Sequence, residues 1–220
     1  MKTLTRDLIL ETRRGKSLPR VLINDRMRRM PEITGRILDL ASGNRRPSYF
    51  RFLPVSQKAK ITSVDISTER QPDIIADLEQ KFPFGDSEFD YVFCFNLLEH
   101  IFDHCHVISE AARVLKPGGR LLGTVPFLGS VHADPDDYFR YTKSTLSRLF
   151  LAAGFSRVKI EALGYGPFCV GYYMVAFLLP GIIRPLFLSL AIGLDKIVRW
   201  LRPKHGPQKY VLMYYFTCQK

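Results

Sequence analysis

Residues 37–43 read Ile-Leu-Asp-Leu-Ala-Ser-Gly, an apolar run that opens into a turn of small residues. A second apolar run, Ile-Thr-Ser-Val-Asp at residues 61–65, follows and also ends in an acid. A buried strand that opens into small residues lets backbone N–H groups approach a ligand, and an acid at the tip of the next strand can accept both hydroxyls of a ribose. The pair predicts a nucleoside-binding site, although either segment alone is more typical of an ordinary strand-to-helix turn.

Three further segments with predicted strands follow along the chain. Residues 73–78, Asp-Ile-Ile-Ala-Asp-Leu, place Asp77 after a short apolar run. Residues 89–95, Phe-Asp-Tyr-Val-Phe-Cys-Phe, form a predicted strand that leads into Asn-Leu-Leu-Glu-His at residues 96–100. Residues 112–122, Ala-Arg-Val-Leu-Lys-Pro-Gly-Gly-Arg-Leu-Leu, place a turn before another strand. Strands alternating with helix-like stretches predict a parallel sheet covered on both faces.

The order of these motifs resembles the class I S-adenosylmethionine-dependent methyltransferases. The resemblance is greatest to the small family with an acid-plus-glycine loop, then Val-Asp-Ile-Ser, an Asp-Leu pair and Leu-Glu-His. It covers roughly residues 35–163 and the last strand. It implies an α/β fold with a doubly wound, seven-stranded, mostly parallel sheet, which is the Rossmann-like methyltransferase fold, and S-adenosyl-L-methionine as cofactor.

The resemblance also implies which residues contact the cofactor. Asp39 and the turn after it would hold the methionine part, Asp65 the ribose hydroxyls, and Asp77 the adenine. Each acid has a structural alternative, because Asp65 could cap the next helix and Asp77 could initiate a turn. The loop keeps only Gly43 of the family's three glycines, and Arg45 cannot adopt a glycine-only backbone cheaply. The implied contacts are Asp39, Ala41, Ser42, Gly43, Asp65, Ile66, Asp77, Leu78 and Asn96.

Catalysis by such a protein depends mainly on orientation, because methyl transfer from a sulfonium is an in-line displacement. A hydroxyl acceptor must also lose a proton, for which a histidine or a carboxylate is the natural base at neutral pH. His100 lies just past a predicted strand, where the family's cofactor pocket meets the substrate side. A helix-capping or core histidine is an equally good interpretation of that position.

The segment at residues 125–142 is the richer source of catalytic candidates. It packs a histidine, three aspartates, two tyrosines and an arginine around a proline, and its pattern resembles a methyltransferase subgroup associated with glycan or cell-envelope assembly. A turn followed by a helix N-cap would explain some of the acids. We expect His132 to be the base and Asp137 its orienter or a second base. The expected substrate contacts, suited to a phosphate or carboxylate on the acceptor, are Tyr138, Arg140 and Tyr141.

The composition indicates one compact core with additional elements. At 220 residues and 46% hydrophobic content the chain can bury a single core. A net charge of +11 and a pI near 9.6 favour an anionic partner such as phosphate, nucleic acid or an acidic membrane surface. No secretory signal is expected, since no long apolar stretch starts at the N-terminus. The cysteines lack a metal-ligand spacing, so reduced thiols of a cytosolic protein and no metal site are predicted for Cys94, Cys105, Cys169 and Cys218.

The chain divides into four parts that differ in charge and in the pattern of apolar residues. Residues 1–34 are basic, with Ile23, Met27 and Met30 at helical spacing, and are interpreted as a helical lid or docking segment. Residues 35–163 form the cofactor-binding core. Residues 164–206 form an apolar helical insertion, and residues 207–220 supply the last strand that completes the core sheet.

The insertion raises the question of a membrane. Residues 162–183 carry no formal charge, and that length exceeds the roughly 18 residues that suggest a spanning segment. A spanning helix is the weaker interpretation, because the last strand must return to the same sheet and glycines and prolines interrupt the stretch. We expect an interfacial or re-entrant helical hairpin, with an ordinary helical subdomain or a dimer interface as alternatives. Its basic flank is Lys196, Arg199, Arg202, Lys204 and Lys209, which would suit anionic headgroups.

These features combine into one functional hypothesis. The chain is expected to methylate an oxygen of a small-molecule, glycan or lipid-linked acceptor near a membrane, as a cytoplasmic protein that is peripheral at the membrane's inner face. A nucleic-acid methyltransferase is the enzymatic alternative, because positive charge also suits a phosphate backbone, but the chain has no Asn/Asp-Pro-Pro-Tyr/Phe motif. The other alternative is a non-catalytic membrane- or partner-binding protein that retains the fold.

Overall fold

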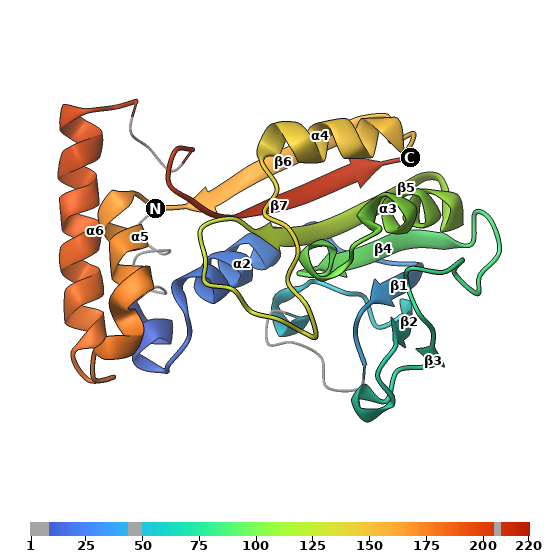
Figure 1. Ribbon diagram of the computed structural model, residues 1–220, viewed down its shortest axis with the longest axis horizontal. Helices are drawn as coiled ribbons and strands as arrows, with labels where there is room; N and C mark the ends of the chain where they lie inside the picture. The colour runs from blue at the N-terminus through green and yellow to red at the C-terminus, as the bar shows by residue number, and fades with distance from the viewer. Residues whose placement is uncertain (1–8, 44–49, 205–207) are drawn as a thin grey trace. The chain divides into compact units, whose positions relative to one another are not determined.

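A seven-stranded sheet in the order β3-β2-β1-β4-β5-β7-β6 forms the centre of the fold (Figure 1). The computed structural model describes residues 9–43, 50–204 and 208–220. The strands are β1 (Arg36–Leu40), β2 (Lys60–Asp65), β3 (Ile74–Ile75), β4 (Phe89–Phe95), β5 (Leu115–Pro126), β6 (Arg157–Gly164) and β7 (Val211–Gln219). The predicted doubly wound, seven-stranded α/β fold is confirmed.

Strands β1 to β5 pair in parallel, as their apolar sequences predict. β1 lies between β2 and β4, and Leu38 is aligned with Thr62 on one side and Val92 on the other. Leu38 and Val92 are fully buried, as expected of parallel strands covered on both faces. The chain order reverses between β1 and β4, and ligands of open α/β sheets bind beyond the carboxyl ends of the strands at such a point.

The far half of the sheet contains the two last strands. The backbone N–H of Ser156, just before β6, donates to the carbonyl of Gln219 at the end of β7 at 2.8 Å. Figure 1 accordingly draws the arrows of β6 and β7 in opposite directions. β6 is an edge strand, as the alternation of residues 157–161 predicts. The predicted Pro-Gly-Gly turn lies inside β5 as an irregularity, where Phe89 and Tyr91 of β4 face Leu115 and Arg120.

Helices α3 (His104–Val114) and α4 (Lys143–Ala152) begin at side-chain caps. The Asp103 side chain accepts the N–H of His106, and the Thr142 hydroxyl accepts the N–H of Thr145. α4 ends just before Gly154, whose φ of +90° is the left-handed conformation that glycine adopts most readily. Short 3-10 helices connect the strands: η1 (Phe50–Phe52), η2 (Thr68–Arg70) and η3 (Leu98–His100).

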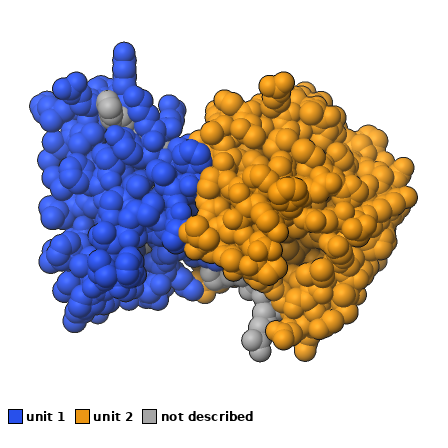
Figure 2. Space-filling model, in the orientation of Figure 1, with its two compact units in different colours: residues 1–29, 127–130, 162–213 blue, residues 30–126, 131–161, 214–220 orange. Residues whose placement is uncertain are grey.

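The chain divides into two compact units (Figure 2). Unit 1 comprises residues 1–29, 127–130 and 162–213, and unit 2 comprises residues 30–126, 131–161 and 214–220. The sequence interpretation separated the N-terminal segment from the insertion, whereas the structure groups them in unit 1. Leu18, Val21 and Leu22 of the predicted N-terminal helix, α2 (Leu18–Arg28), pack in one core with Leu188 and Ile192.

The apolar insertion forms α5 (Pro167–Val175), η4 (Ala176–Leu178) and α6 (Arg184–Leu201). Asp195 of α6 is buried, and its carboxylate accepts the backbone N–H groups of Phe168 and Cys169 at 2.9 and 3.0 Å. This contact satisfies two of the N–H groups that the first turn of α5 leaves without an intrahelical partner. Among the described residues, none of the helices is both long enough and apolar enough to span a membrane.

Candidate active site

The loop after β1 brings the first predicted cofactor residues to the carboxyl edge of the sheet. Asp39 is buried within β1, beside Ser63 of β2 and Phe93 of β4. Ala41 follows the strand with a φ of 54°, so a methyl-bearing residue takes the left-handed conformation that a glycine would adopt freely. Arg45, which departs from the family pattern, lies outside the described residues.

Ser42 and Gly43 form a tight cradle at this edge. The Ser42 hydroxyl oxygen is buried and makes no hydrogen bond among the described residues. A Cβ at Gly43 would overlap the backbone carbonyl of Arg70, so only glycine fits between the loop and η2. An orphan buried hydroxyl beside a small-residue turn suits a polar ligand that approaches the backbone closely.

Asp65, the last residue of β2, is buried and already has two partners. Its Oδ1 accepts the backbone N–H of Ser67 at 2.8 Å, and its Oδ2 accepts from the Arg70 guanidinium at 3.1 Å. The first contact resembles the cap that the sequence left open as an alternative role. Arg70 also forms an ion pair with Asp134. A ribose that binds Asp65 would therefore replace the Arg70 contact.

The third acid, Asp77, is exposed beyond the end of β3. Its Oδ1 accepts the N–H of Glu79 at 2.9 Å, so the turn that the sequence allowed does form. Leu78 beside it is buried, whereas Ile66 after β2 is 65% exposed. Because β2 and β3 pair in parallel, Asp65 and Asp77 lie at the same edge of the sheet.

Asn96 follows β4 with a φ of 51°, a conformation that asparagine tolerates better than most residues. Its backbone N–H donates to the Thr124 carbonyl at 2.8 Å, and its side-chain oxygen accepts the Thr124 hydroxyl at 2.6 Å. The second bond directs the side-chain NH₂ of Asn96 away from Thr124. These contacts hold Asn96, the first residue after β4, against β5.

The two catalytic histidines predicted from distant parts of the sequence lie together. The ring centroids of His100 and His132 are 5.1 Å apart, and the rings are perpendicular. Between them lies Glu99, whose Oε1 is 3.6 Å from His132 Nε2 and 3.8 Å from His100 Nε2. The structure therefore brings both candidate bases to one buried carboxylate.

Asp137 is tied to the same cluster through His132. Its Oδ2 accepts the backbone N–H of His132 at 2.9 Å and lies 3.6 Å from the Nδ1 of that ring. Arg140 donates to both carboxylate oxygens of Asp137. The hydrogen bonds from Arg140 hold the pKa of the Asp137 carboxyl well below its usual value. The role of Asp137 as orienter of His132 stays a prediction, while Arg140 is engaged within the protein.

The two predicted substrate tyrosines differ in exposure. Tyr141 is buried, donates its hydroxyl to the Leu98 carbonyl at 2.9 Å, and has its pKa raised by burial. That contact is typical of a side chain that fixes the position of η3. Tyr138 is exposed, and its hydroxyl donates to Asp136 Oδ2 at 2.9 Å. Substrate contact remains a prediction for both residues.

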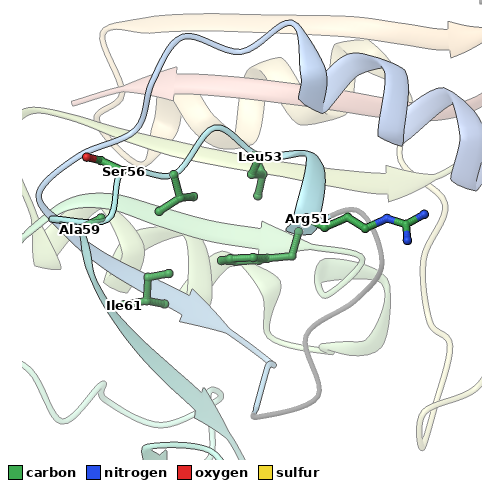
Figure 3. Close-up of a pocket in the computed structure, with 7 residues that line it drawn as sticks. Arg51, Leu53, Ser56, Ala59 and Ile61 are labelled. Carbon is green, nitrogen blue, oxygen red and sulfur yellow. The ribbon is translucent and has the colours of Figure 1, made fainter.

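A hollow of about 420 Å³ lies elsewhere on unit 2, around the amino end of β2 (Figure 3). Figure 3 shows Leu53 and Ile61 on opposite sides of it, and Arg51 extending away. None of the predicted cofactor or catalytic residues lines it. Parallel α/β sheets bind their ligands at the carboxyl ends of the strands, so this hollow is not the candidate active site.

Sequence reasoning missed two residues of the site. Glu99 belongs to the Leu-Glu-His motif, but only the histidine of that motif was assigned a role. The local sequence after one strand does not show which of these side chains points into the protein. Arg70 was missed because its partners, Asp65 and Asp134, are far apart in the sequence. An arginine shortly after a strand-end acid would have been the only local signal.

Comparison with known proteins agrees with this geometry. The family model described as "Methyltransferase domain" matches residues 38–123. This part of the chain is therefore similar to known methyltransferase domains. A solved S-adenosylmethionine-dependent methyltransferase from Archaeoglobus fulgidus is similar in fold, with a TM-score of 0.58 and 18% identity over 91% of this chain and 94% of that one.

Two curated relatives are similar in sequence to part of this chain. The 27-O-demethylrifamycin SV methyltransferase of Amycolatopsis mediterranei is 34% identical over 120 residues, covering 46% of this chain and 43% of the relative. The demethylmenaquinone methyltransferase of Staphylococcus saprophyticus is 30% identical over 114 residues, covering 38% and 49%. The chain spans less than half the length of these two relatives.

The residues at the carboxyl edge of the sheet fit S-adenosylmethionine as the cofactor. Asp65 and Asp77 at adjacent strand ends would hold the ribose and the adenine. The orphan Ser42 hydroxyl and the Gly43 cradle would receive the amino-acid part. The predicted set of cofactor contacts therefore lies along one continuous edge, from β3 through β2 and β1 to the end of β4.

Proposed function

We propose that the protein is an S-adenosylmethionine-dependent methyltransferase that methylates a hydroxyl oxygen of a small-molecule or lipid-linked acceptor near a membrane. The observation that carries the proposal is the linkage between the cofactor acids and the histidine cluster. Arg70 contacts both Asp65, on the cofactor side, and Asp134, in the segment that contains His132. This contact supports one site in unit 2 that combines the predicted cofactor residues with the candidate base.

The chemistry divides between positioning and proton removal. The cofactor supplies the methyl group as a sulfonium. His132 would accept the proton of the acceptor hydroxyl at Nε2. Its Nδ1 faces the Asp137 carboxylate, and its Nε2 lies on the side of Glu99. The distance of 3.6 Å from Nδ1 to Asp137 is long for a hydrogen bond, as is common for catalytic contacts without bound substrate. Arg140 fixes Asp137, which in turn orients the ring.

The class of acceptor is supported by the names of the relatives. The two relatives are named for the small organic molecules that they methylate, demethylmenaquinone and 27-O-demethylrifamycin SV. The name of the rifamycin enzyme states that the methyl group is added to an oxygen. The exposed aromatic side chains of Phe102 and Tyr138, with ring centroids 5.4 Å apart, offer an apolar contact near the histidines. Such a surface suits an acceptor with an apolar or ring-shaped part.

Membrane contact is supported by unit 1. One side of α6 packs in the core through Leu188 and Ile192, while an opposite stripe of large apolar residues is exposed. A helix that is apolar on both sides requires a second apolar environment. The net charge of +11 would favour an anionic lipid surface. The exposed stripe consists of Leu186, Leu190, Ile197, Trp200 and Leu201.

Calorimetric titration with S-adenosylmethionine and S-adenosylhomocysteine tests the cofactor site. We expect Asp65→Ala and Asp77→Ala each to weaken binding at least tenfold, and Asp86→Ala, which removes an exposed acid that pairs with Arg113, to leave it unchanged. Arg70→Ala should tighten binding about two- to fivefold, because it removes a partly exposed ion pair that competes for Asp65. Absence of binding to the folded protein would favour the non-catalytic alternative.

Transfer of a labelled methyl group tests the reaction itself. Phenolic, saccharide and isoprenoid acceptors would be supplied in anionic vesicles. We expect His132→Ala to reduce transfer by about 10²- to 10⁴-fold without changing cofactor affinity, as expected for loss of a general base. Equal transfer rates for wild type and His132→Ala would remove His132 from the mechanism.

A further inference from the structure

Glu99 has an environment that the proposed methyl transfer leaves unexplained. Its side chain is fully buried, and neither carboxylate oxygen accepts a hydrogen bond among the described residues. Its nearest polar neighbours are the two histidine rings, at 3.6 and 3.8 Å, beyond ordinary hydrogen-bond distance. Buried carboxylates are normally hydrogen-bonded, paired at close range or coordinated to a metal ion.

The three side chains have the spacing of a metal site. One ligand atom from each of Glu99, His100 and His132 can be chosen so that all three lie within 4.8 Å of one another. Two atoms bound to one tetrahedral zinc ion at 2.0–2.1 Å are about 3.4 Å apart. The distances of 3.6 and 3.8 Å from Glu99 Oε1 to the two Nε2 atoms approach that value. The third separation, between the two histidine ligand atoms, is within 4.8 Å, so the side chains would rotate toward one ion on binding it.

The outer nitrogen of each ring faces a protein acceptor, as in known metal sites. His100 Nδ1 lies 2.6 Å from the Asp136 carbonyl, which can only accept, so Nδ1 is the donor; in the neutral ring Nε2 would then present its lone pair to Glu99. His132 Nδ1 faces the Asp137 carboxylate at 3.6 Å. Ligand histidines almost always direct their other ring nitrogen to a carbonyl or a carboxylate in this way.

We propose that Glu99, His100 and His132 bind one divalent transition-metal ion, with zinc the best match. Two imidazoles and one carboxylate suit zinc, whereas calcium and magnesium prefer oxygen ligands. Three protein ligands leave an open coordination position, as in catalytic zinc sites. The half-exposed ring of His132 leaves this position accessible to solvent.

Metal binding stands independently of the proposed function, and only its catalytic meaning rests on it. With an ion bound, the Nε2 lone pair of His132 is used in coordination and cannot also accept a proton. The ion would then take over the task of lowering the pKa of the acceptor hydroxyl. The loss of activity in His132→Ala is therefore common to both roles, and only a direct binding measurement separates them.

Equilibrium dialysis of the chelator-treated full chain against zinc is the first test. We expect one ion per chain, with Glu99→Gln and His132→Ala each weakening binding at least 100-fold. Asp137→Asn should weaken it about 10- to 100-fold through His132. His106→Ala, which removes a histidine outside the cluster, should bind like wild type. If Glu99→Gln fails to fold because Glu99 is buried, the half-exposed His132 still allows the test through His132→Ala.

Cobalt substitution distinguishes this site from thiol sites. The visible spectrum should show cobalt bound by nitrogen and oxygen, without a thiolate charge-transfer band, and Cys105→Ser should leave it unchanged. Zinc binding that persists in both Glu99→Gln and His132→Ala, or a thiolate band that Cys105→Ser removes, would overturn the proposal. Zinc binding by a protein that does not bind S-adenosylmethionine would overturn the proposed function alone.

Discussion

Individual residues at the carboxyl edge of the sheet adopt backbone conformations that most side chains avoid. Ala41, Gln71 and Asn96 all have φ near +50°. Gln71 follows η2, and the other two follow β1 and β4, so all three lie in the segments that carry the cofactor residues. Strained backbone of this kind is typical of ligand-binding sites, where the surrounding structure supports it.

Ala41→Gly is expected to stabilise the protein by about 0.5–1 kcal/mol. The left-handed conformation costs an alanine roughly 1–2 kcal/mol, and the greater freedom of glycine in the unfolded chain offsets about half of that. Urea unfolding measures the difference. Ala59→Gly is the matched control, because Ala59 has no positive φ and the same change there should destabilise. A loss of stability in Ala41→Gly would show that the Ala41 methyl group makes a compensating contact.

At the scale of elements, the apolar insertion is organised by one polar contact. The sequence predicts two apolar helical pieces, and α5 and α6 form them. The carboxylate of Asp195 crosses from α6 to the first turn of α5, and a Cβ at Gly166 would overlap that carboxylate. An acid inside an apolar helix therefore joins α5 and α6.

Asp195→Ala is expected to lower the free energy of unfolding by about 1–3 kcal/mol, because it leaves the part-buried N–H of Phe168 and the buried N–H of Cys169 without their acceptor. Lys196→Ala, at the exposed neighbouring position, should change it by less than about 0.5 kcal/mol. Chemical unfolding followed by circular dichroism compares the two variants. Equal stabilities would mean that packing alone holds α5 against α6.

On the scale of the whole molecule, the predicted site residues and the exposed apolar side chains belong mostly to different parts of the chain. Twelve of the nineteen large apolar side chains identified as exposed among the described residues belong to residues 164–206. Unit 2, in contrast, contains every predicted cofactor and catalytic residue. Catalysis and docking can therefore be tested by substitutions in separate units.

Vesicle flotation tests the docking surface in the full chain. We expect wild type to float with anionic vesicles and the double variant Ile197→Ser, Trp200→Ser to bind at least tenfold more weakly, because each side chain would bury apolar area worth about 1–3 kcal/mol. Leu151→Ser, which changes an exposed apolar residue of unit 2, is the control. Unchanged flotation of the double variant would assign the stripe to a protein partner instead.

The sequence by itself predicted the main strands, a mostly parallel sheet and the strand ends that carry the predicted cofactor acids. Those features follow from local patterns, since an apolar run that ends in an acid or a small-residue turn is readable from neighbouring residues. Only the tertiary structure decided that Arg70 contacts Asp65, that α2 shares a core with α6, and that Glu99 lies between His100 and His132. Such contacts join residues that are distant in the chain, and side-chain direction and burial arise only when the elements pack.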